Sequence, residues 1–124
     1  MKRELVELEG FNFNLLSPAF KAGGLVFTSG HIGMDIETGV IGEGIEKQTE
    51  IALTTIRRIL ANAGATMNDV IKVTIFLADL RDYKGMNKIY LRYFDEPRPA
   101  RSCVKAELAR PELKVEIEVV ACIP

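Results

Sequence analysis

Two segments of this chain carry apolar side chains every three or four residues, the spacing typical of amphipathic helices. In the first, the apolar stripe consists of Ile45, Thr49, Ala52, Ile56, Ile59 and Ala63. Gly64 follows, and glycine commonly ends helices. The second has Tyr83, Met86, Tyr90 and Tyr93 at helical spacing, after Asp79, a residue type that caps helices. The patterns predict helices over Ile45–Ala63 and about Arg81–Phe94.

Other segments alternate apolar with polar residues or are rich in β-branched side chains, as strands are. The predicted strands are Ala19–Ala22, Leu25–Ser29, Val70–Ala78, Arg101–Leu108 and Lys114–Ile123, with a peripheral strand within Arg3–Leu15. Gly23-Gly24 predicts a tight hairpin turn between the first two, because glycine adopts positive φ without steric cost. After this hairpin the order is strand–helix–strand–helix–strand–strand. We therefore expect one α+β domain over residues 1–124, with two helices on one face of a sheet.

Two helices leave the other face of the sheet uncovered. The alternation predicts that this face mixes charged and apolar side chains: Lys72, Thr74, Phe76, Arg101, Cys103, Lys105, Glu107, Glu116 and Glu118. Such a face is either wet, as antiparallel sheets allow, or covered by other subunits with pockets at the seams. If the last two strands form a simple hairpin, Lys105 pairs with Glu116 across it.

The composition limits which partners and which catalytic groups the protein can use. Lys+Arg 16 against Asp+Glu 17 gives a formal net charge of -1, which disfavours a nucleic-acid partner. No apolar run approaches the roughly 20 residues of a membrane span, and the start lacks the apolar block of a signal peptide, so we expect a cytoplasmic protein without a membrane partner. With His 1 and Cys 2, a zinc finger is excluded and no metal site is expected. Catalysis would then rest on carboxylates, arginine, backbone groups or one thiol.

Two charged residues stand out as candidates. Arg101 begins a strand, and its planar guanidinium can hold a carboxylate through two charge-assisted bonds; the alternative is a structural ion pair. Glu116 can orient or deprotonate a water molecule; its alternative is the cross-strand pair with Lys105. Both interpretations remain open for both residues.

The remaining candidates are weaker. Cys103 is either a thiol activated by Arg101 or, as we favour, a buried structural cysteine. Gly30 can let a ligand approach the backbone, and Ser29 can donate a hydrogen bond to it. A hydrolase built on Ser29 and His31 is disfavoured, because the segment is no G-x-S-x-G nucleophile elbow.

Five motifs together resemble the RidA (YjgF-type) family of reactive-intermediate, or imine, deaminases. They are Phe27-Thr28-Ser29-Gly30, the strand Val70–Leu77, Met86-Asn87, Pro99-Ala100-Arg101-Ser102-Cys103-Val104 and Val115-Glu116-Ile117-Glu118. Each is weak alone, but they occur in the family's order from about Ser17 to Ala121. The resemblance therefore covers nearly the whole chain.

The resemblance implies a chorismate-mutase-like α+β fold with a mixed sheet, assembled as a homotrimer with ligand clefts between subunits. It also implies another strand between the last two, against the simple hairpin. The implied reaction is hydrolysis of short-lived 2-imino acids, or their enamine tautomers, to 2-keto acids and ammonia. This reaction needs no metal or organic cofactor.

By the same resemblance, Arg101 grips the substrate carboxylate and Glu116 handles the attacking water. Ser29, Gly30, Asn87 and the backbone of Cys103 line the cleft. The chain departs from the family at two positions: Leu16 stands thirteen residues before Ser29, where many members have tyrosine, and His31 replaces a common glutamine. Two rival functions share this cleft, a non-catalytic trimer that binds small carboxylates and a ribonuclease.

Overall fold

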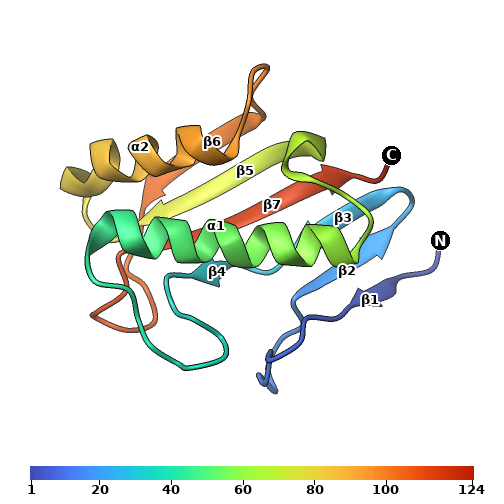
Figure 1. The fold of residues 1–124 in the computed structure, drawn as a ribbon, viewed down its shortest axis with the longest axis horizontal. Coiled ribbons are helices and arrows are strands. Elements are labelled where there is room, and N and C mark those ends of the chain that lie inside the picture. The colour runs from blue at the N-terminus through green and yellow to red at the C-terminus, as the bar shows by residue number, and fades with distance from the viewer.

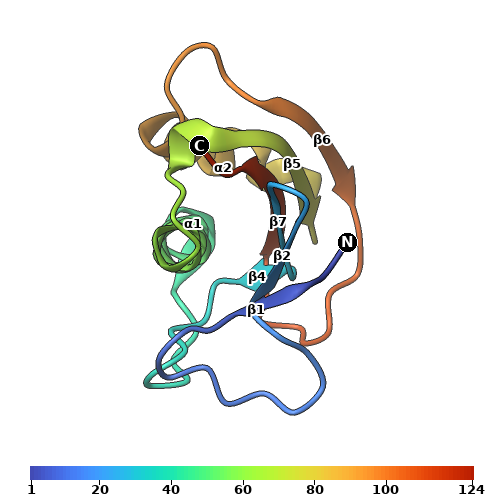
Figure 2. The ribbon, with the colours of Figure 1, turned by 90° about the vertical axis from the view of Figure 1, so that its right-hand side faces the viewer.

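A seven-stranded mixed sheet carries two helices on one face (Figures 1 and 2). The computed structural model describes residues 1–124. The strands are β1 Glu4–Val6, β2 Ala19–Ala22, β3 Leu25–Thr28, β4 His31–Ile32, β5 Val70–Leu77, β6 Ala100–Lys105 and β7 Val115–Cys122. The helices are α1 Gly44–Asn62 and α2 Tyr83–Tyr93, with short 3-10 turns η1 Met67–Asp69 and η2 Leu80–Asp82. Neither α-helix is long and apolar enough to cross a membrane.

The predicted helices and strands are confirmed, with small shifts at their ends. Gly23 and Gly24 have φ of 56° and 81°, which a type I′ hairpin turn requires at both central residues. Gly64 follows α1 with φ of 85°, in the left-handed region that ends many helices. Asp79 caps η2, because its side chain accepts a hydrogen bond from the Arg81 backbone nitrogen at 2.9 Å. Strand β4 was not predicted, since two residues are too few to show alternation.

The strand order is β1-β2-β3-β7-β5-β6, and β4 also pairs with β7. The simple hairpin of the last two strands is wrong, because β5 lies between them. Strand β6 runs parallel to β5 after the crossover through α2, whereas β7 returns antiparallel on the other side of β5. Lys105 therefore pairs with Leu77, and Glu116 pairs with Phe76.

The register of β6 corrects the predicted position of Arg101 and Cys103. They pair with Val73 and Ile75, whose side chains are fully buried on the helix-covered face. The prediction placed them on the uncovered face because apolar residues 106 and 108 appeared to continue the alternation toward the helices. The strand ends at Lys105, so those residues do not belong to it. Glu116 and Glu118 do lie on the uncovered face, beside Phe76 and Thr74.

The core lies between α1 and the central strands. Its fully buried side chains include Ala52, Ile56 and Ile59 of α1, Val73, Ile75 and Leu77 of β5, and Val115 and Ile117 of β7. Gly85 brings α2 close to the start of α1: a Cβ there would lie 2.7 Å from the Ile45 Cγ2 atom. This close approach explains a glycine inside a helix, where it otherwise costs up to about 1 kcal/mol relative to alanine.

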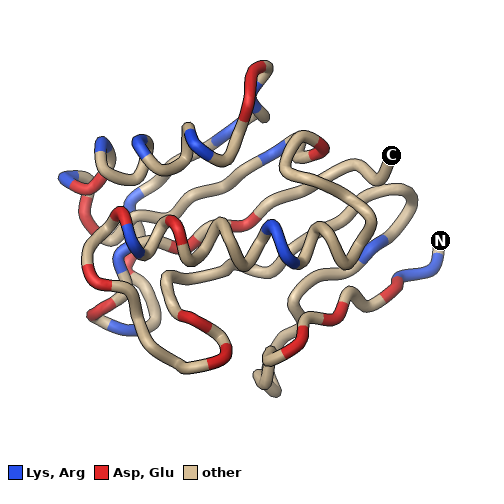
Figure 3. The backbone as a smooth tube through the Cα atoms, in the orientation of Figure 1, with Lys and Arg blue, Asp and Glu red and all other residues tan.

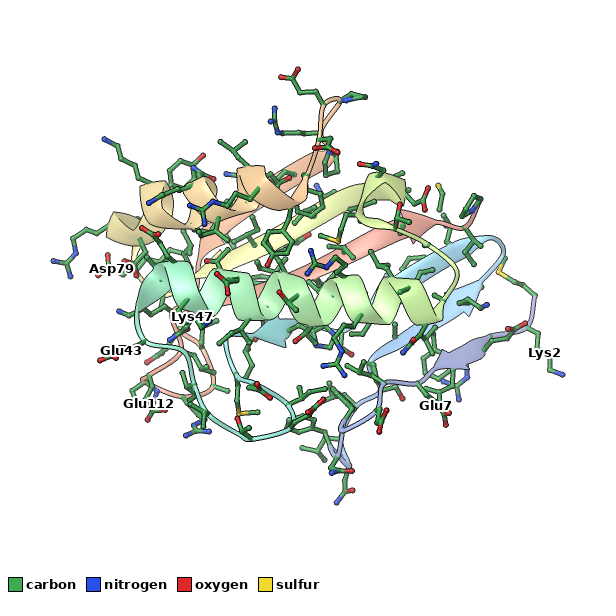
Figure 4. All side chains as sticks on the ribbon, viewed as in Figure 1. Lys2, Glu7, Glu43, Lys47, Asp79 and Glu112 are labelled. Carbon is green, nitrogen blue, oxygen red and sulfur yellow. The ribbon has the colours of Figure 1, made fainter.

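Gln48 ties the start of α1 to the loop between β6 and β7. Its Nε2 donates to the carbonyl oxygens of Gly42 and Glu112 at 3.0 and 2.9 Å, and its Oε1 accepts from the Lys114 backbone nitrogen at 2.8 Å. The side chain is almost fully buried, with 1% exposed. Figure 4 shows labelled Glu112, in this loop, at the same end of the molecule as Glu43 and Lys47 at the start of α1. One amide thus satisfies three backbone groups.

We expect Gln48→Ala to lower the free energy of unfolding by about 2 kcal/mol, because buried backbone groups lose their partners. Urea denaturation measures this change. The matched control is Lys47→Ala, which removes only an exposed pair with Glu50 and should change stability by about 0.5 kcal/mol or less. Equal losses in the two variants would contradict the assigned role of Gln48.

Candidate functional site

Five of the candidate residues line one cavity, of about 390 Å³, on the side of the sheet where β3 gives way to β4. They are Leu16, Ser29, Gly30, His31 and Glu116. The rest of the wall consists of Phe11, Phe13, Ile32, Met34, Ile36, Thr55, Ala109 and Leu113. Sequence reasoning missed Phe11 and Phe13 as site residues, although both fall in the segment Arg3–Leu15, for which it predicted a peripheral strand. The cavity is therefore mostly apolar, with one carboxylate.

Gly30 allows the Glu116 carboxylate to lie directly against the backbone. A Cβ at Gly30 would overlap the Glu116 carboxylate oxygen and lie 2.8 Å from its carboxyl carbon. Gly30 has no positive φ, so this position needs glycine for space rather than for backbone conformation. The break between β3 and β4 thus creates the room in which the carboxylate sits.

Ser29 fastens the N-terminal segment to this break. Its Oγ donates to the Ser17 carbonyl at 2.6 Å, and its backbone nitrogen donates to the Pro18 carbonyl at 3.0 Å. The hydroxyl proton is committed to that carbonyl, which is unlike the arrangement of a nucleophilic serine. Ser29 therefore shapes the cavity wall.

Glu116 has a raised pKa, first because burial disfavours its charged form and second because Glu118 lies nearby on the same face. A carboxyl group with a raised pKa exchanges protons closer to neutral pH, which suits general acid–base work. Because its pKa is higher in the folded chain, ionisation of Glu116 lowers the free energy of unfolding as the pH rises through that pKa.

His31 is buried and uncharged. Only 4% of the residue is exposed, and its Nε2 donates to the Pro18 carbonyl at 3.1 Å. Burial lowers its pKa, and the hydrogen bond to Pro18 offsets this only in part. The imidazole is therefore neutral at physiological pH. Leu16, on the same wall, has no group that carries a proton.

Arg101 lies elsewhere, under α2. Its guanidinium carbon sits 4.7 Å from the centre of the Tyr90 ring, and its Nη2 donates to the Tyr83 hydroxyl at 3.1 Å. The guanidinium forms none of the seven salt bridges of the chain. Sequence analysis treated Tyr83 and Tyr90 only as helix core, although their spacing placed both on one side of α2. An arginine held by aromatic rings without a carboxylate is available to bind an anion.

Asn87 lines the same shallow pocket as Arg101, together with Tyr90, Leu91, Arg98 and Pro99. Its Oδ1 is buried and has no hydrogen-bond partner in the chain. A buried amide oxygen without a partner is uncommon and is consistent with a donor from a ligand or another molecule. Figure 3 shows Lys and Arg positions along α2, which carries Lys84, Lys88 and Arg92, and Arg98 lies in the loop before β6.

Cys103 is half-buried near Arg101. Burial raises the pKa of its thiol, and the positive charge of Arg101 opposes this only in part. The thiol therefore stays protonated at neutral pH, unlike an activated nucleophile. This supports the structural interpretation of its side chain.

The two charged candidates, Arg101 and Glu116, lie on opposite faces of the sheet. Glu116 pairs with Phe76 on the uncovered face, whereas Arg101 pairs with Val73 on the helix-covered face. Alternation along β5 separates the two faces, so one chain does not bring Arg101 and Glu116 together. The cavity beside Glu116 has a carboxyl group but no Lys or Arg, and the pocket around Arg101 has a guanidinium but no Asp or Glu.

Comparison with known proteins identifies the family to which the sequence motifs point. The sequence model of the family described as Endoribonuclease L-PSP matches residues 12–123. The chain is 42% identical to Reactive Intermediate Deaminase A, chloroplastic, of Arabidopsis thaliana over 99% of this chain and 67% of that protein. It is 43% identical to 3-aminoacrylate deaminase RutC of Acinetobacter baylyi over 84% of this chain and 83% of that protein. The chain belongs to the RidA/YjgF family.

A solved structure of this family has the same fold. Escherichia coli TdcF with bound serine superposes with a TM-score of 0.89 at 31% identity, covering 96% of this chain and 98% of that one. The mixed α+β sheet with two helices, implied by the resemblance, is therefore confirmed. So is the strand between the last two, which the register shows directly.

We expect Glu118→Gln to lower the pKa of Glu116 toward its ordinary value of 4.5, because one of the two causes of its shift is removed. Burial remains, so the pKa should stay above that value. Carbon-detected NMR titration of the Glu116 carboxyl measures the change. Glu96→Gln, on the loop before β6, is the control and should leave the titration unchanged; an unchanged titration in Glu118→Gln would contradict the assignment.

Proposed function

We propose that this protein hydrolyses reactive 2-imino acids, and their enamine tautomers, to 2-keto acids and ammonia in clefts between the subunits of a homotrimer. The observation that carries the proposal is the state of Arg101: a half-buried guanidinium with no carboxylate partner, beside an unsatisfied Asn87 oxygen. A small acid with a hydrogen-bond donor is the ligand that such a pair fits. Relatives named as deaminases support the reaction class.

The separation of the two groups supports a shared site. In the proposed assembly, Arg101 of one subunit faces Glu116 of the next. The uncovered face of the sheet carries half-exposed Phe27 and Val104, with 47% and 46% of each residue accessible in the single chain. Covering these apolar side chains with other subunits provides a driving force for assembly. We therefore propose that the protein's macromolecular partner is a further copy of the same chain. We also propose that it acts in the cytoplasm.

In this mechanism, Arg101 holds the substrate carboxylate and fixes the imine carbon beside Glu116. Ionised Glu116 takes a proton from water as the water oxygen bonds to the imine carbon. Glu116 passes that proton to the imine nitrogen, which gives a neutral carbinolamine. It then takes the proton of the carbinolamine hydroxyl and transfers it to the nitrogen, so that the C–N bond breaks, the C=O bond forms and ammonia leaves. The balance is imine plus water to ketone plus ammonia, with no change of oxidation state, so no cofactor takes part.

The two rival functions receive less support. Ribonuclease activity is part of the matched family's description. However, the charged residue that lines the cavity is Glu116, and a carboxylate repels an RNA phosphate. A non-catalytic carboxylate-binding trimer would keep Arg101 and have no need of an acid with a raised pKa.

A mixing experiment tests the shared site. We expect Arg101→Ala and Glu116→Gln each to lose at least about a hundredfold in turnover, the scale of general acid–base catalysis. Trimers refolded from an equal mixture should recover about a quarter of wild-type activity, because random assembly supplies both intact residues at one seam in four. Keto-acid release from a dehydratase-generated imine is the readout, with each variant refolded alone as the control. A mixture no more active than its parents would contradict a site between subunits.

Arg101→Lys tests the carboxylate anchor. Lysine keeps the charge but loses the planar two-point contact, so the affinity for a stable 2-keto acid should fall about tenfold or more. Isothermal titration calorimetry measures this affinity. Arg92→Lys, exposed on α2, is the matched control and should bind like the wild type. Undiminished binding in Arg101→Lys would contradict the assignment.

A further inference from the structure

The cavity beside Glu116 is larger and more apolar than a small imino acid requires. About 390 Å³ is available, and eight of its thirteen lining residues are hydrophobic. Its aromatic part consists of Phe11 and Phe13, whose ring centres lie 4.8 Å apart, and Phe11 also lies 6.2 Å from the His31 ring. Phe13 and Leu16 are each 44% exposed, so apolar surface remains accessible at the mouth. A methyl or ethyl substituent would leave most of this surface in contact with water.

Two polar side chains of the wall are hydrogen-bonded within the protein. Ser29 Oγ donates to Ser17, and His31 Nε2 donates to Pro18. The buried imidazole is uncharged, so the cavity has no cation to receive an acidic substituent. A second carboxylate in the substrate would instead meet Glu116. These features select against polar and acidic side chains.

We propose that this cavity binds the substrate's side chain and that the preferred substrates are 2-imino acids with branched aliphatic or aromatic side chains, such as those formed from leucine or phenylalanine. This inference rests on the proposed function. If Arg101 of a neighbouring subunit holds the carboxylate and Glu116 handles the water, the remaining substituent of the imine carbon points into the cavity that Glu116 lines. Phe13 and Leu16 are then the residues that determine specificity.

The expected preference follows from the apolar area removed from water. Each methylene buried in an apolar site improves transition-state binding about fourfold. The isobutyl group of the leucine-derived imine has three more carbons than the methyl group of the alanine-derived imine. We expect kcat/KM to be at least tenfold higher for the leucine-derived imine, which allows for incomplete burial.

An L-amino-acid oxidase with catalase generates the imines of alanine, leucine and phenylalanine in place, and semicarbazide traps whatever is not hydrolysed. We expect half-suppression of trapping for leucine and phenylalanine at a protein concentration at least tenfold lower than for alanine. Equal concentrations for all three, or a preference for alanine, would overturn the inference and leave the deaminase function standing. No suppression with any imine would overturn both.

Two adjacent leucines provide a matched pair of variants. Leu16→Asn places an amide on the cavity wall, and we expect it to lower the leucine-to-alanine ratio of kcat/KM about tenfold. Leu15→Asn makes the same change at a side chain that is 95% exposed and outside the cavity, and the ratio should not move. A Leu16→Asn variant with an unchanged ratio would overturn the assignment of the cavity to the substrate's side chain, and circular dichroism verifies that both variants are folded.

Discussion

The pairing of β5 with a parallel neighbour on one side and an antiparallel neighbour on the other determines where every functional group lies. Side chains alternate between faces along a strand, and directly paired residues share a face. Arg101 pairs with Val73 and therefore lies on the helix-covered face, whereas Glu116 pairs with Phe76 and lies on the uncovered face. A shift of β6 by one residue relative to β5 would turn the Arg101 side chain to the uncovered face. The buried neighbours of Val73 and Ile75 oppose such a shift. In the proposed assembly, the division of the site between two chains follows from this register.

Contacts with neighbouring residues then keep Glu116 and Arg101 in position. Gly30 leaves the space that the Glu116 carboxylate occupies, while Ser29 and His31 fix the adjacent N-terminal segment through the carbonyls of Ser17 and Pro18. On the other face, Tyr83 and Tyr90 hold the guanidinium of Arg101 with an edge free of carboxylates. In the proposed mechanism, Glu116 and Arg101 are thus oriented before a substrate arrives, which lowers the entropic cost of binding it.

Local patterns predicted the helices, the long strands and the Gly23-Gly24 turn, because each depends on neighbours close in sequence. The faces of β6 could not be predicted in this way. Its side chains alternate, but which set points toward the helices depends on pairing with β5, whose paired residues lie 28 positions earlier, and on the end of the strand at Lys105. The role of Gln48 was also invisible, since its partner at Lys114 is 66 residues away. Motif resemblance identified Arg101 and Glu116, whereas their tyrosine and phenylalanine neighbours emerged only from packing.

The departures at Leu16 and His31 concentrate proton transfer on one group. Leu16 has no ionisable atom, the Ser29 proton is committed to a carbonyl, and burial keeps His31 neutral with Nε2 already donating. Glu116 is the carboxyl group of this cavity, and in the proposed mechanism it accepts a proton from water and returns it to nitrogen. A carboxyl group can do both only if neither form is strongly favoured near the working pH, and burial beside Glu118 moves its pKa in that direction. Burial in the same apolar cavity therefore lowers the pKa of His31 and raises the pKa of Glu116.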